Sequence, residues 1–184
     1  PGAWPAHWLL PQNGGWPDAG EIDIMEAIAD YPTSTHGSFH GGTIEGETKT
    51  HHSVHNWHDP EDDRFSEAYH VYAIEWGAGA IRFFVDDLQI GVVHEGTMLE
   101  TKVEDSPDEA LIDTYWGMRA VDIPDTPFHW ILNTSIVPNG GLTEKAMADF
   151  EAMSHHIDWV KVYEACTTDQ DGCLPKSNRS VRVT

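Results

Sequence analysis

Apolar and polar residues alternate along much of this 184-residue chain in short runs. A period of two is typical of a β-strand with one buried face, and turns rich in Gly, Pro and Asp separate the runs. Strands are predicted at residues 21–29, 36–40, 69–76, 80–85, 89–93, 128–136 and 155–164. Short strands without long helical runs predict an all-β fold, namely a two-sheet antiparallel β-sandwich.

The segments between these strands carry weaker signals. Hairpin turns are predicted at residues 77–79 and 86–87, and one short helix at residues 143–150, with Thr143 as its N-cap. Residues 97–127 hold few clear strand signals. We expect a long excursion there, close enough to a binding cleft to influence substrate choice.

Three carboxylates interrupt the apolar run at residues 20–26, just after a Trp16-Pro17 turn. In a strand, Glu21 and Asp23 project from one face while the isoleucines between them face the core. Glu26 breaks this alternation, and a β-bulge of one residue would return it to the face of Glu21 and Asp23. The sequence therefore predicts three acids in one small patch.

Such a patch favours glycoside hydrolysis. Carboxylates a few ångströms apart raise one another's pKa, so one carboxyl tends to keep its proton. A retaining glycosidase needs one ionised and one protonated carboxyl, roughly 5 to 5.5 Å apart. The alternative is a solvated strand edge with acids facing water, but tryptophans suited to stacking on sugar rings flank this run.

Residues Glu21 to Glu26, Glu-Ile-Asp-Ile-Met-Glu, resemble the bulged E-x-D-x-x-E motif of glycoside hydrolase family 16, closest to its laminarinase-like endo-β-1,3-glucanases. Further segments resemble the family in the same order along most of the chain. They are the W-P-A-x-W-x-L-P segment at residues 4–11, the cleft histidine region at 36–42, the H-x-Y-x-x-E-W strand at 70–76 with the hairpin strand at 81–86, the F-x-x-x-x-N strand at 128–133 and the closing strand at 157–163.

The resemblance implies a jelly roll of the concanavalin A-like type over residues 1–165, followed by a tail at 166–184. It implies that Glu21 is the nucleophile and Glu26 the general acid/base, with Asp23 holding the geometry and proton balance of the nucleophile. The implied activity is endo-cleavage of internal β-1,3 links of a polysaccharide with retention. The bulged spacing favours this activity over that of lichenase-like relatives, whereas galactan hydrolases share the bulge.

Substrate contacts are expected from Trp4, Trp16, His40 and Asn133. Two interpretations of His40 stay open, a contact with substrate or with the acid/base, and a bond to a strand-end carbonyl. Trp8 is expected in the core. For Trp57, Trp116 and Trp130 the sequence does not distinguish core from cleft.

Composition is that of a secreted sugar enzyme with one sizeable core. The formal net charge of −21 disfavours nucleic acid and argues weakly for a neutral glucan over a sulfated one. No apolar run is long enough to span a membrane. Cys166 and Cys173 are expected to close a small disulfide loop in an extracellular compartment, although two free thiols remain an alternative.

Metal binding is a secondary expectation, and no cofactor is expected to be required. The histidines at 51, 52, 55 and 58 are interpreted as a solvent-facing loop rather than a metal site, because polar residues and a proline surround them. In many members of the family an aspartate aligned with Asp158 holds calcium, which implies a structural calcium here.

Members of the family carry several strands ahead of the W-P-A-x-W segment, whereas this chain begins immediately before it at Pro1. We expect the rest of a longer precursor or another chain to supply those strands, and the 184 residues alone to be poorly stable. The alternative function is a noncatalytic glucan-binding or extracellular structural protein. The intact acid motif favours the enzyme.

Overall fold

The computed structural model describes residues 2–28, 31–45, 48–60, 64–77, 79–104, 114–136, 154–163 and 179–181. These residues form strands and turns, without a helix. Contacts divide the chain into two units, residues 1–148 and 149–184, which are described separately. Within the described residues, no helix is long and apolar enough to cross a membrane.

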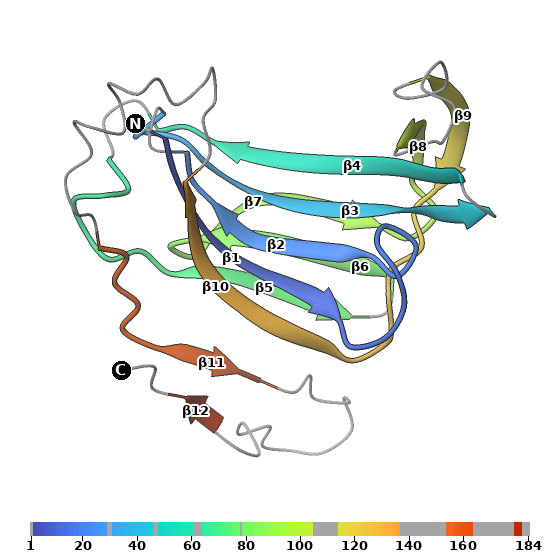
Figure 1. Cartoon of the computed structure of the whole chain (residues 1–184). Helices are drawn as coiled ribbons and strands as arrows, with labels where there is room; N and C mark the ends of the chain where they lie inside the picture. Colours follow the sequence, from blue (N-terminus) through green and yellow to red (C-terminus); the bar gives the residue numbers. More distant parts are fainter. Residues whose placement is uncertain are drawn as a thin grey trace. The chain divides into compact units, whose positions relative to one another are not determined.

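The first unit is an antiparallel two-sheet sandwich (Figure 1). Its larger sheet has the order β10-β1-β2-β3-β4-β8-β9, and its smaller sheet the order β5-β6-β7. The bounds in the larger sheet are β1 Ala3–Pro11, β2 Glu21–Glu26, β3 Thr35–Glu45, β4 Thr48–His58, β8 Met98–Glu104, β9 Tyr115–Ala120 and β10 Phe128–Ile136. In the smaller sheet they are β5 Tyr72–Gly77, β6 Ala80–Val85 and β7 Leu88–His94.

The core lies between these two sheets. Ile22 and Phe39 of the larger sheet belong to the same buried cluster as Ile81, Phe83 and Val93 of the smaller sheet. Ile22 and Phe39 face the smaller sheet, so the residues that alternate with them along β2 and β3 lie on the other face of the larger sheet. Burial of one face thereby determines which side chains form the site.

The predicted β-bulge is present in β2 and accounts for the position of Glu26. Along β3, Asp23 pairs with Ser38 and Glu26 pairs with His36, so two β2 residues lie opposite Gly37 alone. Gly37 is buried, and a Cβ at this position would meet the Phe83 ring of the smaller sheet. The glycine therefore allows the smaller sheet to approach behind the bulge.

Most predicted strands are confirmed, and both predicted hairpins are present. Asp86 and Asp87 have positive φ angles of 47° and 68° and join β6 to β7, as a tight hairpin turn requires. The predicted helix at residues 143–150 lies outside the described residues.

Two predictions about loops were wrong. The histidine-rich run is not a loop, because it forms β4 and pairs with β3 along eleven residues. Residues 97–127 are not strand-poor either. β8 and β9 extend the larger sheet beyond β4, and Thr101 and Val103 of β8 are buried.

In the second unit, β11 (Val160–Val162) pairs antiparallel with β12 (Arg179–Val181). Asp158 precedes β11 and is exposed. Cys166 and Cys173 lie outside the described residues, so the disulfide stays a prediction. The expected boundary between a domain at 1–165 and a tail at 166–184 also stays a prediction.

Candidate active site

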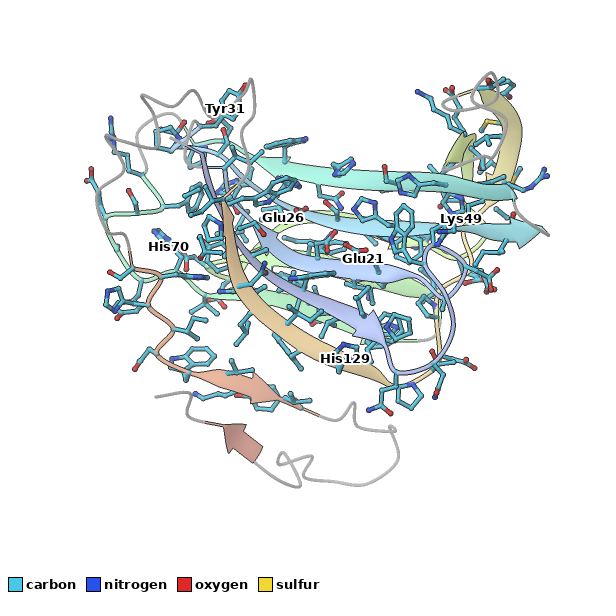
Figure 2. All side chains as sticks on the ribbon, in the orientation of Figure 1. Glu21, Glu26, Tyr31, Lys49, His70 and His129 are labelled. Atoms are coloured by element: carbon cyan, nitrogen blue, oxygen red, sulfur yellow. The ribbon has the colours of Figure 1, made fainter. Side chains whose placement is uncertain are left out.

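The three acids of β2 share one face of the larger sheet, opposite the core. Cross-strand pairing aligns Glu21 with His40, Asp23 with Ser38, and Glu26 with His36. Residues directly opposite in a sheet project to the same side, so these six side chains form one surface. Figure 2 labels Glu21 and Glu26 along β2.

Burial sets the protonation of Glu21 and Asp23. Asp23 is only 2% exposed, and desolvation together with the charge of Glu26 raises its pKa to about 8. Desolvation and the charge of Asp23 raise the pKa of Glu21 to about 7, although His40 and a hydrogen bond from Trp16 act in the opposite direction. As predicted, neighbouring acids hold protons near neutral pH, and burial is the larger cause.

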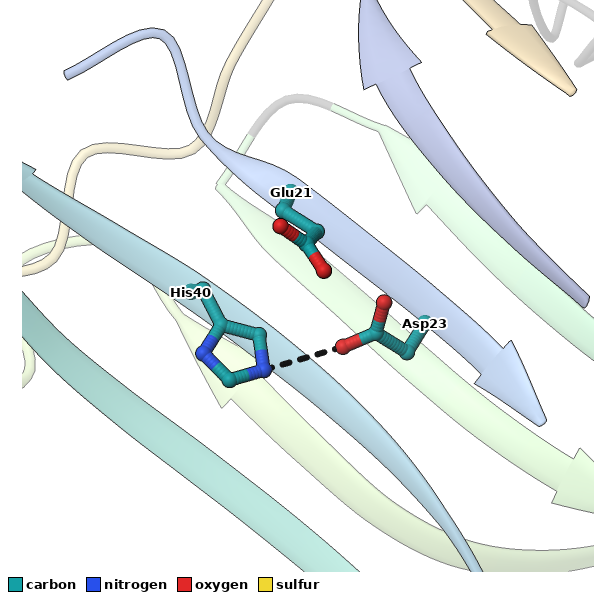
Figure 3. Close-up of side chains that lie close together, drawn as sticks. All are labelled: Glu21, Asp23 and His40. Carbon is teal, nitrogen blue, oxygen red and sulfur yellow. Dashed lines mark ion pairs between the residues drawn. The ribbon is translucent and has the colours of Figure 1, made fainter. Parts of the chain in front are cut away.

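His40 connects this pair of acids to β4. Its Nε2 lies 3.0 Å from Oδ2 of Asp23, and its Nδ1 lies 2.9 Å from Nε2 of His51. Figure 3 shows Glu21 and Asp23 on β2 and the His40 ring on β3, with the His40–Asp23 contact dashed. The contact with the carboxylate favours the interpretation of His40 as part of the site.

Glu26 has a different environment. Its Oε2 lies 2.9 Å from Nε2 of His36 and accepts a hydrogen bond from Ser38 Oγ at 3.4 Å. Burial raises the pKa of Glu26, but the hydrogen bond and charge of His36, together with the charges of His40 and His55, leave the pKa below its usual value. Substrate-free Glu26 is therefore biased toward ionisation.

The histidines of β4 are the part of the site that the sequence prediction missed. His51 and His55 share the face of the acids, and Nδ1 of His55 lies 2.9 Å from Ser38 Oγ. Burial, followed by the charges of His40 and His36, lowers the pKa of His55. His52 lies on the opposite face and is buried near Phe39. Val54 is the only apolar residue among residues 50–56, so alternation gives little signal for this strand.

The predicted sugar contacts occupy the same face. The ring of Trp16 lies 5.0 Å from that of His51. Trp4 and Asn133 lie on this face by their register along β1 and β10.

The expectation that Trp8 lies in the core was wrong. Its partner across the sheet is Asp23, and its Nε1 donates a 2.9 Å hydrogen bond to Asn133 Oδ1. Trp4 and Trp8 are four residues apart on β1, so the period of two places both on the face of the acids.

For three tryptophans the sequence did not distinguish core from cleft. Of these, Trp57 lies on the face of the acids, paired with His36. Trp130 lies on the opposite face, paired with Leu9 of the core. The side chain of Trp116 lies outside the described residues.

Metal ligands are grouped at one place among the described residues. Glu21, Asp23 and His40 present ligand atoms within 4.8 Å of one another. Asp158 is not part of any such group of acid, cysteine or histidine ligands in the described chain. The described residues thus add no side-chain support for a calcium site at Asp158, which stays a prediction.

The arrangement provides carboxyls of unequal proton affinity on one face beside aromatic side chains. Burial raises the pKa of Glu21 and Asp23 to about 7 and about 8, and Glu26 lies 2.9 Å from the ring of His36. A face of this kind can supply a nucleophile, a proton donor and stacking surfaces for a sugar polymer.

Curated relatives match nearly the whole chain. It is 32% identical to glucan endo-1,3-beta-glucosidase A1 of Niallia circulans over 89% of this chain and 22% of that protein. It is 33% identical to a beta-glucanase of Rhodothermus marinus, over 88% of this chain and 52% of the relative. A beta-1,3-glucan-binding protein of Penaeus monodon is 29% identical, over 91% and 56%.

A solved structure agrees with the fold. The catalytic domain of an endo-1,3-beta-glucanase (laminarinase) from Thermotoga petrophila RKU-1 superposes with a TM-score of 0.53 at 30% identity, covering 74% of this chain and 48% of that domain. This chain thus spans about half the length of that domain, and a fifth to a half of the first two curated relatives.

The family model described as glycosyl hydrolases family 16 matches residues 1–132, which include all three acids and their histidine partners. The jelly-roll architecture of the first unit and the bulged acid strand agree with that match. The chain belongs to glycosyl hydrolases family 16.

Proposed function

We propose that this chain carries the catalytic face of a retaining endo-β-1,3-glucanase that hydrolyses laminarin-type glucans by double displacement. The observation that carries the proposal is the bulged strand β2, which presents Glu21, Asp23 and Glu26 on one face in two different proton environments. The names of the glucan-hydrolysing relatives support the substrate class.

In the first step, Glu21 attacks the anomeric carbon and forms a glycosyl ester while the glycosidic C–O bond breaks. Burial and mutual repulsion of the acids raise the pKa of Glu21 to about 7 and that of Asp23 to about 8, so the pair shares a proton near neutral pH. In the reactive state, Glu21 is ionised and Asp23 holds the shared proton. The buried pair thus produces a nucleophile beside a neutral acid.

Glu26 donates a proton to the leaving oxygen in the same step. In the free protein its partner His36 favours the ionised carboxylate when the imidazole is protonated. A sugar placed over this pair displaces water and makes the separated charges less favourable. The proton then moves from His36 to Glu26, which becomes the acid where the leaving sugar lies.

In the second step, Glu26 accepts a proton from water, and the water oxygen attacks the anomeric carbon. The ester bond to Glu21 breaks, and the product sugar keeps its β configuration. The two carboxyls return to their starting states.

The proposed substrate is a neutral polysaccharide outside the cell. A net charge of −21 opposes the approach of a sulfated chain. The acids and histidines of the site suit hydroxyl-rich rings, and we expect sugar contacts from Trp4, Trp16 and Asn133, which lie on the same face. We expect secretion of the protein, with no cofactor needed for the chemistry.

Trapping the intermediate tests the proposal. A 2-deoxy-2-fluoro β-1,3-gluco-oligosaccharide with an activated leaving group should label the protein once, on the peptide that contains Glu21. Glu21→Gln, which has nearly the same shape, should not be labelled. Turnover without a trappable label, or a label on another acid, would contradict the assignment of the nucleophile.

A second candidate is a glucan-binding protein without hydrolytic activity, which is favoured by the likeness to the Penaeus monodon protein. In that case the protein binds glucan, and Glu21→Gln changes neither binding nor product formation. A galactan hydrolase of the same family is a third candidate, and a parallel assay on β-galactan distinguishes it.

A further inference from the structure

We propose that Trp57 is the platform of a sugar-binding subsite on the leaving-group side of the scissile bond. Its ligand is a pyranose ring of the β-glucan that departs with the leaving oxygen. The inference rests on the proposed function, because the role of Glu26 defines which side is the leaving-group side.

Trp57 belongs to the same cross-strand row as the proposed acid. Glu26 of β2 pairs with His36 of β3, and His36 pairs with Trp57 of β4. Neighbouring strands lie about 4.8 Å apart, so the backbone at Trp57 is roughly 10 Å from that at Glu26. A polysaccharide that crosses the strands would therefore reach Trp57 after leaving Glu26.

The carboxyl of Glu26 lies toward that side. The two side-chain contacts of Glu26 described above, with His36 and Ser38, are with β3 rather than β1. The acid must lie next to the oxygen that it protonates. The leaving sugar is therefore expected over β3 and β4, whereas the strands β1 and β10 lie on the other side of the acids.

The ring of Trp57 is held in place and remains accessible. It packs against the His36 ring, with centroids 4.1 Å apart and planes tilted by 33°. The residue is nevertheless 54% exposed in a strand within the sheet. A fixed, exposed indole suits the C–H face of a pyranose at low entropic cost.

The alternative interpretation is that Trp57 has a structural role only and supports the ring of His36. Single exposed apolar residues are common and need no ligand. The two interpretations differ in what its loss affects. A support for His36 acts through Glu26 on every substrate whose leaving group needs a proton, whereas a leaving-side platform acts only where a leaving sugar is present.

The experiment compares two substrates with the same glycone, one a β-1,3-gluco-oligosaccharide and one with a methyl group in place of the leaving sugars, so that both leaving groups need a proton. For Trp57→Ala, the ratio of kcat/KM on the oligosaccharide to kcat/KM on the methyl glycoside should fall about tenfold. Trp57→Phe keeps an aromatic face and should restore most of the ratio. Trp130→Ala is the control, because Trp130 is 40% exposed on the opposite face of the same sheet.

An unchanged ratio for Trp57→Ala in a protein that cleaves glucan would overturn the subsite while the proposed function stands. Equal losses on both substrates would also overturn it, in favour of a support for His36. A wild-type protein that cleaves neither substrate would refute the proposed function instead. Calorimetric titration with the oligosaccharide then tests Trp57 directly, since a sugar platform requires weaker binding by Trp57→Ala and unchanged affinity rejects it.

Discussion

Nε2 of His51 lies 2.9 Å from Nδ1 of His40, whose other ring nitrogen lies 3.0 Å from Asp23. A histidine on β4 is thereby coupled to the most buried acid of the site. The hydrogen bond between the two rings requires one to donate and the other to accept, so the tautomers of His40 and His51 are linked. The proton balance of the site therefore involves three strands.

His40→Gln should shift the acidic limb of the kcat/KM profile to higher pH. The charge of His40 lowers the pKa of Glu21, so its removal raises a pKa that is already about 7. The nucleophile then ionises at a higher pH. The measurement is the pH dependence of kcat/KM for the wild type and His40→Gln. His94→Gln, which changes an exposed histidine, is the control. A limb that stays in place or moves to lower pH would contradict the proposed coupling.

Asp23→Asn should stabilise the fold at pH 8 and not at pH 4. The folded-state pKa of Asp23, about 8, lies above the ordinary value of 3.8, so the folded state binds more protons and loses stability as pH rises between these values. An amide does not titrate and so removes that loss. At pH 8 we expect the free energy of unfolding to increase by a few kcal/mol at most, which raises Tm by several degrees. Thermal unfolding at both pH values, in parallel with activity, measures it. An equal change in Tm at pH 4 and pH 8 would show that the raised pKa of Asp23 is not the cause.

Glu26→Gln should lose far more activity on natural glucan than on a substrate with an activated leaving group. The amide cannot protonate the leaving oxygen, whereas a good leaving group needs no proton. We expect a loss of about 10²- to 10⁴-fold on glucan. Single-turnover rates on both substrates distinguish loss of the proton donor from a general loss of activity. Equal losses on the two would be incompatible with an acid role for Glu26.

Gly37→Ala should destabilise the first unit by about 1 to 3 kcal/mol. The added methyl group would meet the Phe83 ring behind the bulge. Chemical denaturation measures the loss of stability. Gly96→Ala is the comparison, because a Cβ at Gly96 meets no atom within 4 Å. Its φ of +74° adds backbone strain but no clash. A Gly37→Ala protein as stable as the wild type would show that the two sheets can separate at no cost.

Added NaCl should raise Tm by several degrees. With 31 acidic and 10 basic residues, the chain carries a repulsion that screening weakens. Thermal unfolding at 0.1 M and 1 M NaCl, repeated with an equal osmolality of sucrose, separates screening from solvent exclusion. A Tm that falls with salt, or that rises equally with sucrose, would point away from charge repulsion.

The acid strand and most of the sandwich could be predicted from the sequence because apolar alternation there is strong. Glu21 and Asp23 follow a strict period of two, and the position of Glu26 required only one bulge. The turn at Asp86 and Asp87 was equally clear, because tight hairpins favour residues that tolerate positive φ.

The strand β4 could not be predicted in the same way because histidines occupy positions on both of its faces. His51 faces the site and His52 the core, so polarity does not distinguish the two sides. Pairing with β3 determines the strand, and this long-range contact overrides local propensity. The lowered pKa of Glu26 likewise depends on His36, a partner ten residues away on another strand.

Reducing-end release from a soluble β-1,3-glucan, by the wild type and Glu21→Gln side by side, tests the central claim most directly. We expect release by the wild type and a loss of release in the variant, with glucan binding retained. No release by a folded wild-type protein, or equal release by both proteins, would contradict the assignment of Glu21 as the nucleophile of a glucanase.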